Sequence, residues 1–157
     1  MLTEEEKKEI IEEAEAFPFK KAAVIDALKV VQKHKGWISD DSIQDVAEFL
    51  DMSPDEVDSV ATFYSRLYRH PVGRNVILIC DGITCMIMDY ESIYEHVSKK
   101  LGIKFGETTP DNRFTLLPIS CLGDCDKAPS MMINNELYSN LTVEKVDELF
   151  RMLNNEK

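Results

Sequence analysis

Hydrophobic side chains recur at helical spacing over the first seventy residues and predict four consecutive helices. Two of these helices open with capping boxes, Thr3 to Glu6 and Ser53 to Glu56. In each box a hydroxyl and a carboxylate three residues apart satisfy free backbone N–H groups. The predicted helices cover about 3–17, 21–35, 41–50 and 53–64. This regular succession is typical of a small helical bundle.

The apolar positions of these helices predict which faces are buried. Ile10 and Ile11 are expected on the inner face of the first helix, and Ala61 and Tyr64 on that of the fourth. No chemical motif falls in this half of the chain. We therefore expect residues 1–70 to form an N-terminal helical bundle that carries no chemistry itself.

The pattern changes after the turn residues 70–73, because short apolar runs now alternate with helical stretches. The expected strands are 76–79, 114–119, 131–133 and 136–138, and the expected helices are 90–101 and 142–153. Parallel strands joined by a helix need a right-handed crossover, and a closing hairpin adds antiparallel strands. The order therefore predicts an α+β chain in which residues 73–157 form a thioredoxin-like domain, a four-stranded mixed sheet with flanking helices.

The candidate chemistry lies in four cysteines, which form two close pairs: Cys80 with Cys85, and Cys121 with Cys125. Each pair follows a predicted strand. Because parallel strands of a βαβ unit end at the same edge of the sheet, the two pairs should converge although 35 residues separate them. In a reducing compartment such thiols indicate metal or redox chemistry more than disulfides.

The spacing within the pairs narrows the choice of metal. Thiolates select zinc, Cu(I) or iron–sulfur clusters. Structural zinc sites usually use C-x2-C pairs, whereas here the spacings are x4 and x3, and C-x4-C also occurs in plant-type ferredoxins. A dithiol oxidoreductase would need C-x-x-C at a helix start, which neither pair has. The spacing favours a [2Fe–2S] cluster, with zinc and unrelated buried cysteines as the alternatives.

The residues between the cysteines fit a tight and acidic loop. Gly82 and Gly123 each lie inside a pair, where the backbone must bend closely around sulfur. Asp81, Asp124 and Asp126 place carboxylates beside the site. Since reduction adds negative charge to an anionic cluster, these carboxylates are expected to lower its reduction potential.

Composition excludes several other classes of protein. The net charge is −11, so nucleic acid is not an expected partner. No apolar run approaches the roughly 18–20 residues that span a bilayer, and the acidic N-terminus is unlike a targeting signal. We expect a cytoplasmic protein with no direct membrane insertion. No glycine-rich phosphate loop or nucleophile–base pair is found, which argues against a substrate site or NAD site of its own.

One segment carries a highly specific signature: an Asp, a Phe-Thr pair three residues on, and then C-L-G-x-C-x2-A-P. Its residues are Asp111, Phe114, Thr115, Cys121, Leu122, Gly123, Cys125, Ala128 and Pro129. By this signature and by the stretch 60–64, the chain resembles the thioredoxin-like [2Fe–2S] ferredoxin family, which includes the E subunit of NADH:quinone oxidoreductase (respiratory complex I). The resemblance extends over about residues 12–153. It departs from the family at Met86, Ile87 and Met88, where many members have a His and a Gly.

The resemblance implies a specific function. All four cysteines would ligate one [2Fe–2S] cluster, and the chain would be an electron-transfer subunit of the NADH-oxidising module. Its partner would be the flavoprotein subunit that binds FMN and NADH, and the complex would hold it at the inner membrane as a peripheral subunit. Pro129 would follow a cis peptide bond.

Two alternatives accompany this interpretation. Similar subunits serve NAD-dependent formate dehydrogenases and NAD-linked hydrogenases. From another class, the chain could be a zinc-stabilised adapter protein without a redox role. An absorption spectrum separates the last case, because an iron–sulfur protein is coloured and a zinc protein is colourless.

Overall fold

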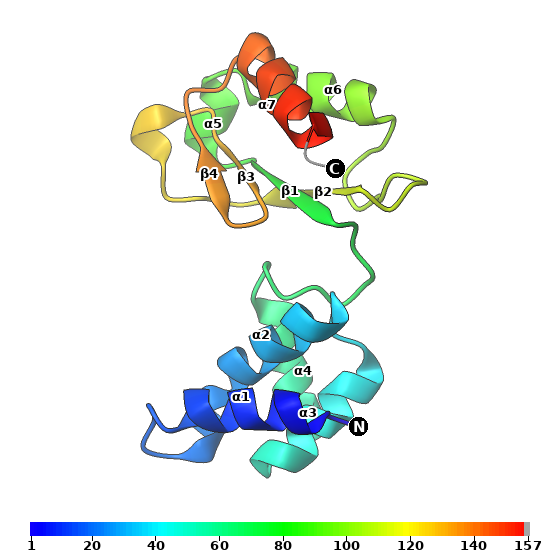
Figure 1. The fold of residues 1–157 in the computed structure, drawn as a ribbon. Coiled ribbons are helices and arrows are strands. Elements are labelled where there is room, and N and C mark those ends of the chain that lie inside the picture. Colours follow the sequence, from blue (N-terminus) through cyan, green and yellow to red (C-terminus); the bar gives the residue numbers. More distant parts are fainter. Residues whose placement is uncertain (156–157) are drawn as a thin grey trace. The chain divides into compact units, whose positions relative to one another are not determined.

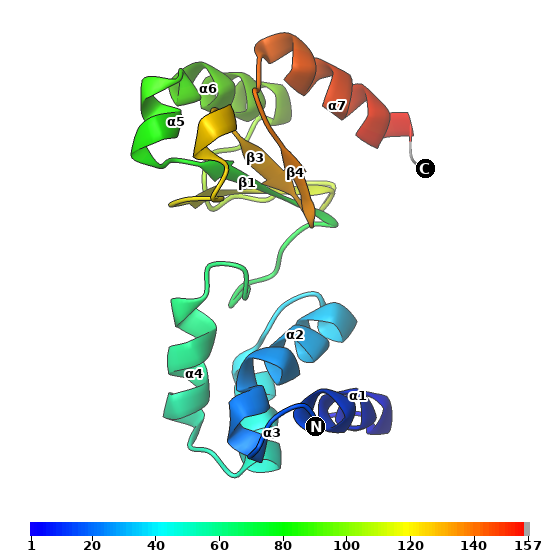
Figure 2. The same cartoon turned by 90° about the vertical axis from the view of Figure 1, so that its left-hand side faces the viewer.

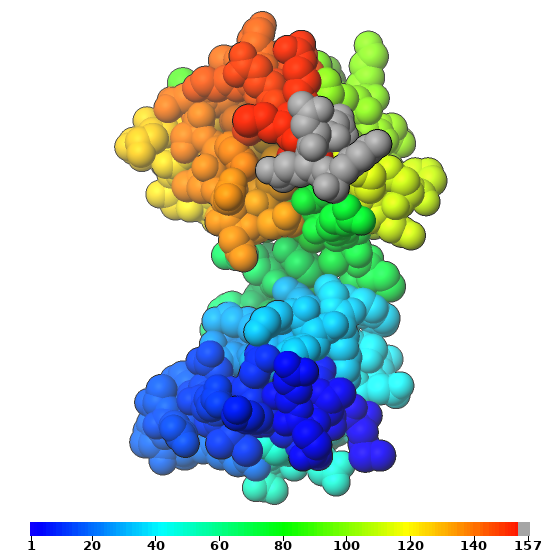
Figure 3. All heavy atoms as spheres, in the orientation of Figure 1, coloured from blue at the N-terminus to red at the C-terminus, as the bar shows by residue number. Residues whose placement is uncertain are grey.

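The computed structural model describes residues 1–155, and the chain divides into two compact units, Met1–Pro71 and Val72–Lys157. Each unit is built from one continuous stretch of chain, which the colour sequence in Figure 3 makes visible. Among the described residues no helix is long and apolar enough to cross a membrane.

The first unit consists of helices, as the hydrophobic pattern predicts. Both predicted capping boxes are formed, and Gly36 ends the second α-helix with a left-handed φ of 83°. Figure 1 shows α1 (Glu4–Ala14), α2 (Val24–Lys35), α3 (Asp40–Leu50) and α4 (Pro54–Phe63), and the 3-10 helix η1 (Lys20–Ala23) precedes α2. Their buried side chains share one core, which includes Ile10, Leu28, Val31, Val46, Leu50, Val57 and Ala61.

Two predicted core residues of this unit are instead at the surface. Ile11 is 49% exposed, and Tyr64 is 42% exposed. Tyr64 lies just beyond the end of α4 with extended backbone angles, so it no longer follows the helical stripe. Ile11 is adjacent to the fully buried Ile10, and one narrow stripe of α1 accommodates only one of them.

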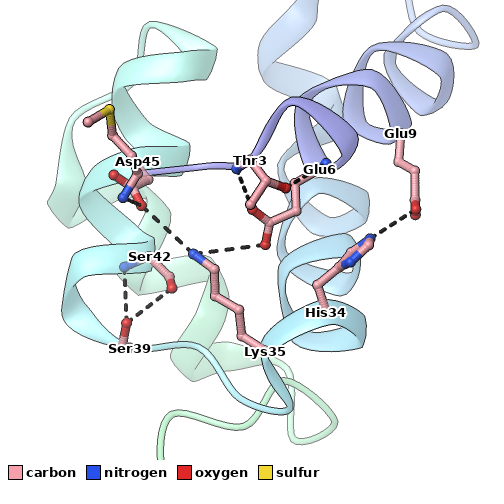
Figure 4. A network of polar contacts seen from close by, with 9 residues as sticks. Thr3, Glu6, Glu9, His34, Lys35, Ser39, Ser42 and Asp45 are labelled. Carbon is pink, nitrogen blue, oxygen red and sulfur yellow. Dashed lines mark hydrogen bonds and ion pairs between the residues drawn. The ribbon is translucent and has the colours of Figure 1, made fainter.

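A network of charged side chains links three helices of the first unit (Figure 4). Glu6 of α1 is 1% exposed, and its Oε2 accepts the Thr3 N–H at 2.7 Å. Lys35 Nζ lies 3.9 Å from Glu6 Oε1 and 3.9 Å from Asp45 Oδ2. Burial of an unpaired carboxylate costs free energy of folding. Lys35, at the end of α2, therefore compensates the charge of Glu6 in α1 and links both helices to α3 through Asp45.

The second unit has the predicted mixed sheet. Its strands are β1 (Asn75–Cys80), β2 (Phe114–Ile119), β3 (Met131–Ile133) and β4 (Glu136–Tyr138), in the order β2-β1-β3-β4. β1 and β2 are parallel, and β3 is antiparallel to both β1 and β4. This arrangement confirms the α+β class and the predicted strand pairing.

The helices of this unit are α5 (Ile83–Ile87), α6 (Tyr90–Leu101), the 3-10 helix η2 (Cys125–Lys127) and α7 (Val143–Asn155). Figures 1 and 2 show α6 and α7 on the same side of the sheet. Their buried residues pack on the apolar side chains of β1 and β2. The contacting set includes Ile77, Ile79, Ile93, Val97, Phe114, Leu116, Val146 and Phe150. The sheet is thereby held rigid below the loops that carry the cysteines.

Candidate metal centre

The parallel strands β1 and β2 bring the two cysteine pairs to one edge of the sheet. Their register pairs Cys80 with Ile119, and the Asp81 N–H donates to the Ile119 carbonyl at 3.0 Å. Both strands therefore end together, and the loop after each begins beside the other. The predicted convergence of the two pairs follows from this register.

Cys80 and Cys85 form an inner pair, at 3% and 1% exposure. Both side chains belong to one small buried cluster with Ala128, against which Leu122 packs. Burial is the main cause that raises the pKa of the Cys80 thiol, and the backbone groups of Gly82 and Leu122 act in the opposite direction. Without a cation, this pocket disfavours thiolates.

Cys121 and Cys125 form an outer pair, and both are exposed. Their sulfurs lie 3.9 Å apart, and the Gly123 N–H donates to the Cys121 sulfur at 3.3 Å. Gly123 has a φ of 75°, a left-handed conformation that glycine adopts without strain. The adjacent Cys121 is the main cause that raises the pKa of the Cys125 thiol, and the Thr84 hydroxyl lowers it.

The two cysteine loops contact each other across the pairs. Leu122, in the outer loop, packs against the buried cluster formed by Cys80, Cys85 and Ala128. Gly82 lies so close to the outer loop that a Cβ there would stand 2.7 Å from the Ser120 carbonyl oxygen. The loops that carry the two cysteine pairs therefore lie against each other, and Gly82 is required for the close approach.

The spacing within the outer pair can be compared with that of thiolates on a metal ion. Among residues 1–155 no group of three or more His, Cys, Asp or Glu side chains is placed to hold a metal ion. A [2Fe–2S] cluster requires two pairs of thiolates, since each of its irons takes two. Two sulfurs bound to one tetrahedral ion at about 2.3 Å lie about 3.8 Å apart, close to the 3.9 Å of the outer pair.

Two neighbours of the site were not identified from the sequence. The buried Ser130 has its hydroxyl 3.8 Å from the Cys85 sulfur, and its carbonyl accepts the Cys80 N–H at 3.2 Å. It follows the Ala128–Pro129 bond, which is cis as predicted. Ser139 donates to the Asp124 carboxylate at 2.5 Å. No spacing rule indicates either serine, because each reaches the site only through the fold.

The acidic residues and the residues that depart from the family differ in exposure. Asp124 is only 9% exposed, whereas Asp81 is half-buried and Asp126 is exposed. The apolar residues near Cys85 face the surface: Ile83, Met86, Ile87 and Met88 are all more than half exposed. The inner pair is covered by Ala128 and by the packed side chains of Tyr90, Ile119 and Leu122, and not by these exposed residues.

Comparison with known proteins gives a consistent result. A family model described as "Thioredoxin-like [2Fe-2S] ferredoxin" matches residues 8–154. The E subunit of NADH-quinone oxidoreductase from Buchnera aphidicola subsp. Acyrthosiphon pisum is 48% identical over 148 residues, covering 94% of this chain and 91% of that protein. The protein of the same name from Escherichia coli K12 is 47% identical, with coverages of 94% and 89%, and that of Pseudomonas aeruginosa is 44% identical, with coverages of 95% and 90%.

Among solved structures, the NAD+-reducing [NiFe]-hydrogenase in the air-oxidised state is similar, with a TM-score of 0.68 and 20% sequence identity. The match covers 81% of this chain and 22% of the hydrogenase chain. The chain thus spans about a fifth of that longer protein. At this identity the likeness shows a shared fold.

Proposed function

Because the chain belongs to the thioredoxin-like [2Fe–2S] ferredoxin family, we propose that its four cysteines ligate the [2Fe–2S] cluster of that family. The observation that carries this proposal is the contact between the loops: Leu122 of the outer loop packs against the buried cluster that contains Cys80 and Cys85, and Gly82 of the inner loop lies against the Ser120 carbonyl. Two thiolate pairs at one sheet edge match the need of two irons.

The function that this site supports best is one-electron transfer within an NADH-quinone oxidoreductase, as its E subunit. Its support is the name and near-complete coverage of relatives at 44–48% identity. Likeness to the hydrogenase concerns the fold alone, so it does not favour a hydrogenase or formate dehydrogenase subunit. The zinc adapter is not favoured either, since the family is one of iron–sulfur proteins.

The chain's own residues have separable tasks in this function. When bound, the cluster supplies a site that accepts and returns one electron. The inner pair, closed off from water, anchors the group to the end of β1. The Gly123 N–H donates to the Cys121 sulfur and stabilises negative charge there. The exposed outer pair leaves one side open to a redox partner.

We infer that this partner is the flavoprotein subunit that binds FMN and NADH, within a complex that lies peripherally at the membrane. In an NADH-oxidising module, the electrons reach the carrier from a subunit that oxidises NADH. The sequence of this chain shows no nucleotide-binding loop, so that subunit is a different one. The first unit holds no cysteine, so we assign it to docking.

Reconstitution with the FMN-binding subunit tests the proposal. The chain is mixed with that subunit, NADH is added, and the EPR signal of the reduced cluster is recorded. We expect NADH to reduce the cluster only when the flavoprotein is present. The function would be contradicted by a cluster that dithionite reduces but that NADH does not reduce even with the flavoprotein present.

A pull-down tests the docking role of the first unit. Residues 72–157 alone should keep the cluster and bind the flavoprotein more weakly than the full chain. Equal binding would contradict the docking role.

A further inference from the structure

The outer cysteine loop is held in place by a segment far from it in sequence. Residues 139–142 join β4 to α7. Ser139 donates its hydroxyl to Asp124 Oδ2 at 2.5 Å, and two backbone bonds follow, from Asn140 N–H to the Lys127 carbonyl at 2.6 Å and from Leu141 N–H to the Pro129 carbonyl at 3.0 Å. The first of these three contacts is the one that a side-chain substitution can remove.

Asp124 lies within the outer cysteine loop. It lies between Cys121 and Cys125 in the chain, directly after Gly123, whose N–H donates to the Cys121 sulfur. Its own carbonyl accepts the Lys127 N–H at 3.1 Å, in the turn that starts at Cys125. Asp124 as a whole is 9% exposed, and a carboxylate on a residue so far removed from water requires a hydrogen-bond donor. Ser139 provides one.

We propose that Ser139 is a positioning residue for the cluster, acting through Asp124. The Ser139 hydroxyl fixes the orientation of the Asp124 carboxylate in the loop and offsets part of the negative charge of that carboxylate. This proposal rests on the proposed ligand set, because it assigns the outer loop to the cluster.

The proposal predicts that loss of the Ser139 hydroxyl and loss of the Asp124 charge shift the reduction potential in opposite directions. Reduction adds one electron to the cluster, which in the experiment comes from dithionite, and a nearby negative charge makes that step less favourable. Loss of the Ser139 hydroxyl leaves the Asp124 charge less compensated, so reduction becomes harder. Loss of the charge itself makes reduction easier, and the hydroxyl then has nothing to compensate.

The test is the midpoint potential of the cluster in the full-length protein, from redox titration followed by EPR. Ser139→Ala should lower the equilibrium constant for one-electron reduction about threefold, or about 28 mV at 59 mV per tenfold change. Asp124→Asn should raise it, and the double variant should equal Asp124→Asn. Ser139→Thr, which keeps the hydroxyl, should retain the wild-type potential. Ser92→Ala is the matched control, since it breaks the Ser92–Asp89 hydroxyl–carboxylate bond in the same unit and outside both cysteine loops.

Two results would overturn the proposal. One is an unchanged potential in Ser139→Ala, which would leave Ser139 a structural role at most. The other is an equal shift from Ser139→Ala in the wild type and in the Asp124→Asn variant, which would show that the hydroxyl acts by another route. Should Ser139→Ala lose the cluster, the comparison of Ser139→Thr with the equally shaped Ser139→Val decides the same question. A wrong ligand set would show separately, as full iron content in Cys125→Ser.

Discussion

The two cysteine pairs have the same chemistry but very different surroundings. The inner pair is at most 3% exposed, with Cys80 at the end of β1 and Cys85 in the middle of α5. The outer pair is exposed, on a loop that depends on its hydrogen bonds to residues 139–141. Under the ligand set proposed above, the difference implies two roles: the inner pair secures the cluster to the fold, and the outer pair presents it to a partner.

The largest expected effect comes from removing single ligands, and it tests this division directly. Cys85→Ser should leave less than about a tenth of the wild-type iron, because an iron loses one of its thiolates inside a closed pocket. Cys125→Ser should lose less, since water can reach the exposed position and replace the sulfur. Iron and acid-labile sulfide analysis of the two purified variants measures the difference. Equal losses would show that burial does not distinguish the pairs.

A substitution at Gly82 should separate the two loops without removing a ligand. The Cβ of Gly82→Ala would meet the Ser120 carbonyl at 2.7 Å, so the loops must move apart at a cost of about 1–3 kcal/mol in the free energy of unfolding. Gly123→Ala is the natural comparison, because its Cβ would be in open space and only its left-handed φ would be strained. Denaturant unfolding of both variants measures the costs. A smaller loss for Gly82→Ala would contradict the close contact.

The Ser130 hydroxyl should raise the reduction potential from the inner side. When Cys85 is a thiolate, the proton in their 3.8 Å contact belongs to the serine, which then stabilises negative charge on sulfur. We expect Ser130→Ala to lower the equilibrium constant for reduction about threefold, or about 28 mV. Redox titration measures it, with the exposed Ser120→Ala as control. An unchanged potential would remove Ser130 from the description of the inner pair.

The smallest effect concerns a site away from both pairs and separates general stability from cluster binding. Lys100 and then His96, both hydrogen-bonded to Asp147, lower the pKa of that carboxyl from 3.8 to about 2. A lowered pKa means that the folded state favours the ionised carboxylate, so this contribution to stability is present above about pH 4 and is lost as the pH falls towards 2. Between these pH values the free energy of unfolding should fall further in wild type than in Asp147→Asn. Urea unfolding followed by circular dichroism checks this, and parallel losses would contradict it.

Much of the fold could be predicted from the spacing of hydrophobic residues and from the capping and turn residues between elements. The capping boxes at Thr3 and Ser53 placed two helices correctly, and strand β2 was predicted with its observed bounds. Helix α5 was missed because five residues are too few for a hydrophobic period to show.

The site itself was predictable to the extent that topology determines it. Parallel strands bring their ends to one edge, so the convergence of Cys80 with Cys121 follows from the order of elements. The serines at 130 and 139 could not be found in this way. Their contacts depend on side-chain positions after a cis proline and after a hairpin, and no sequence period reports those.

The most direct test of the central claim is the metal content of the purified full-length chain, together with its EPR spectrum after reduction with dithionite. We predict two irons and two acid-labile sulfides per chain, a coloured protein, and the signal of one reduced [2Fe–2S] cluster. A colourless protein holding zinc, or an iron content that survives replacement of all four cysteines by serine, would contradict the account.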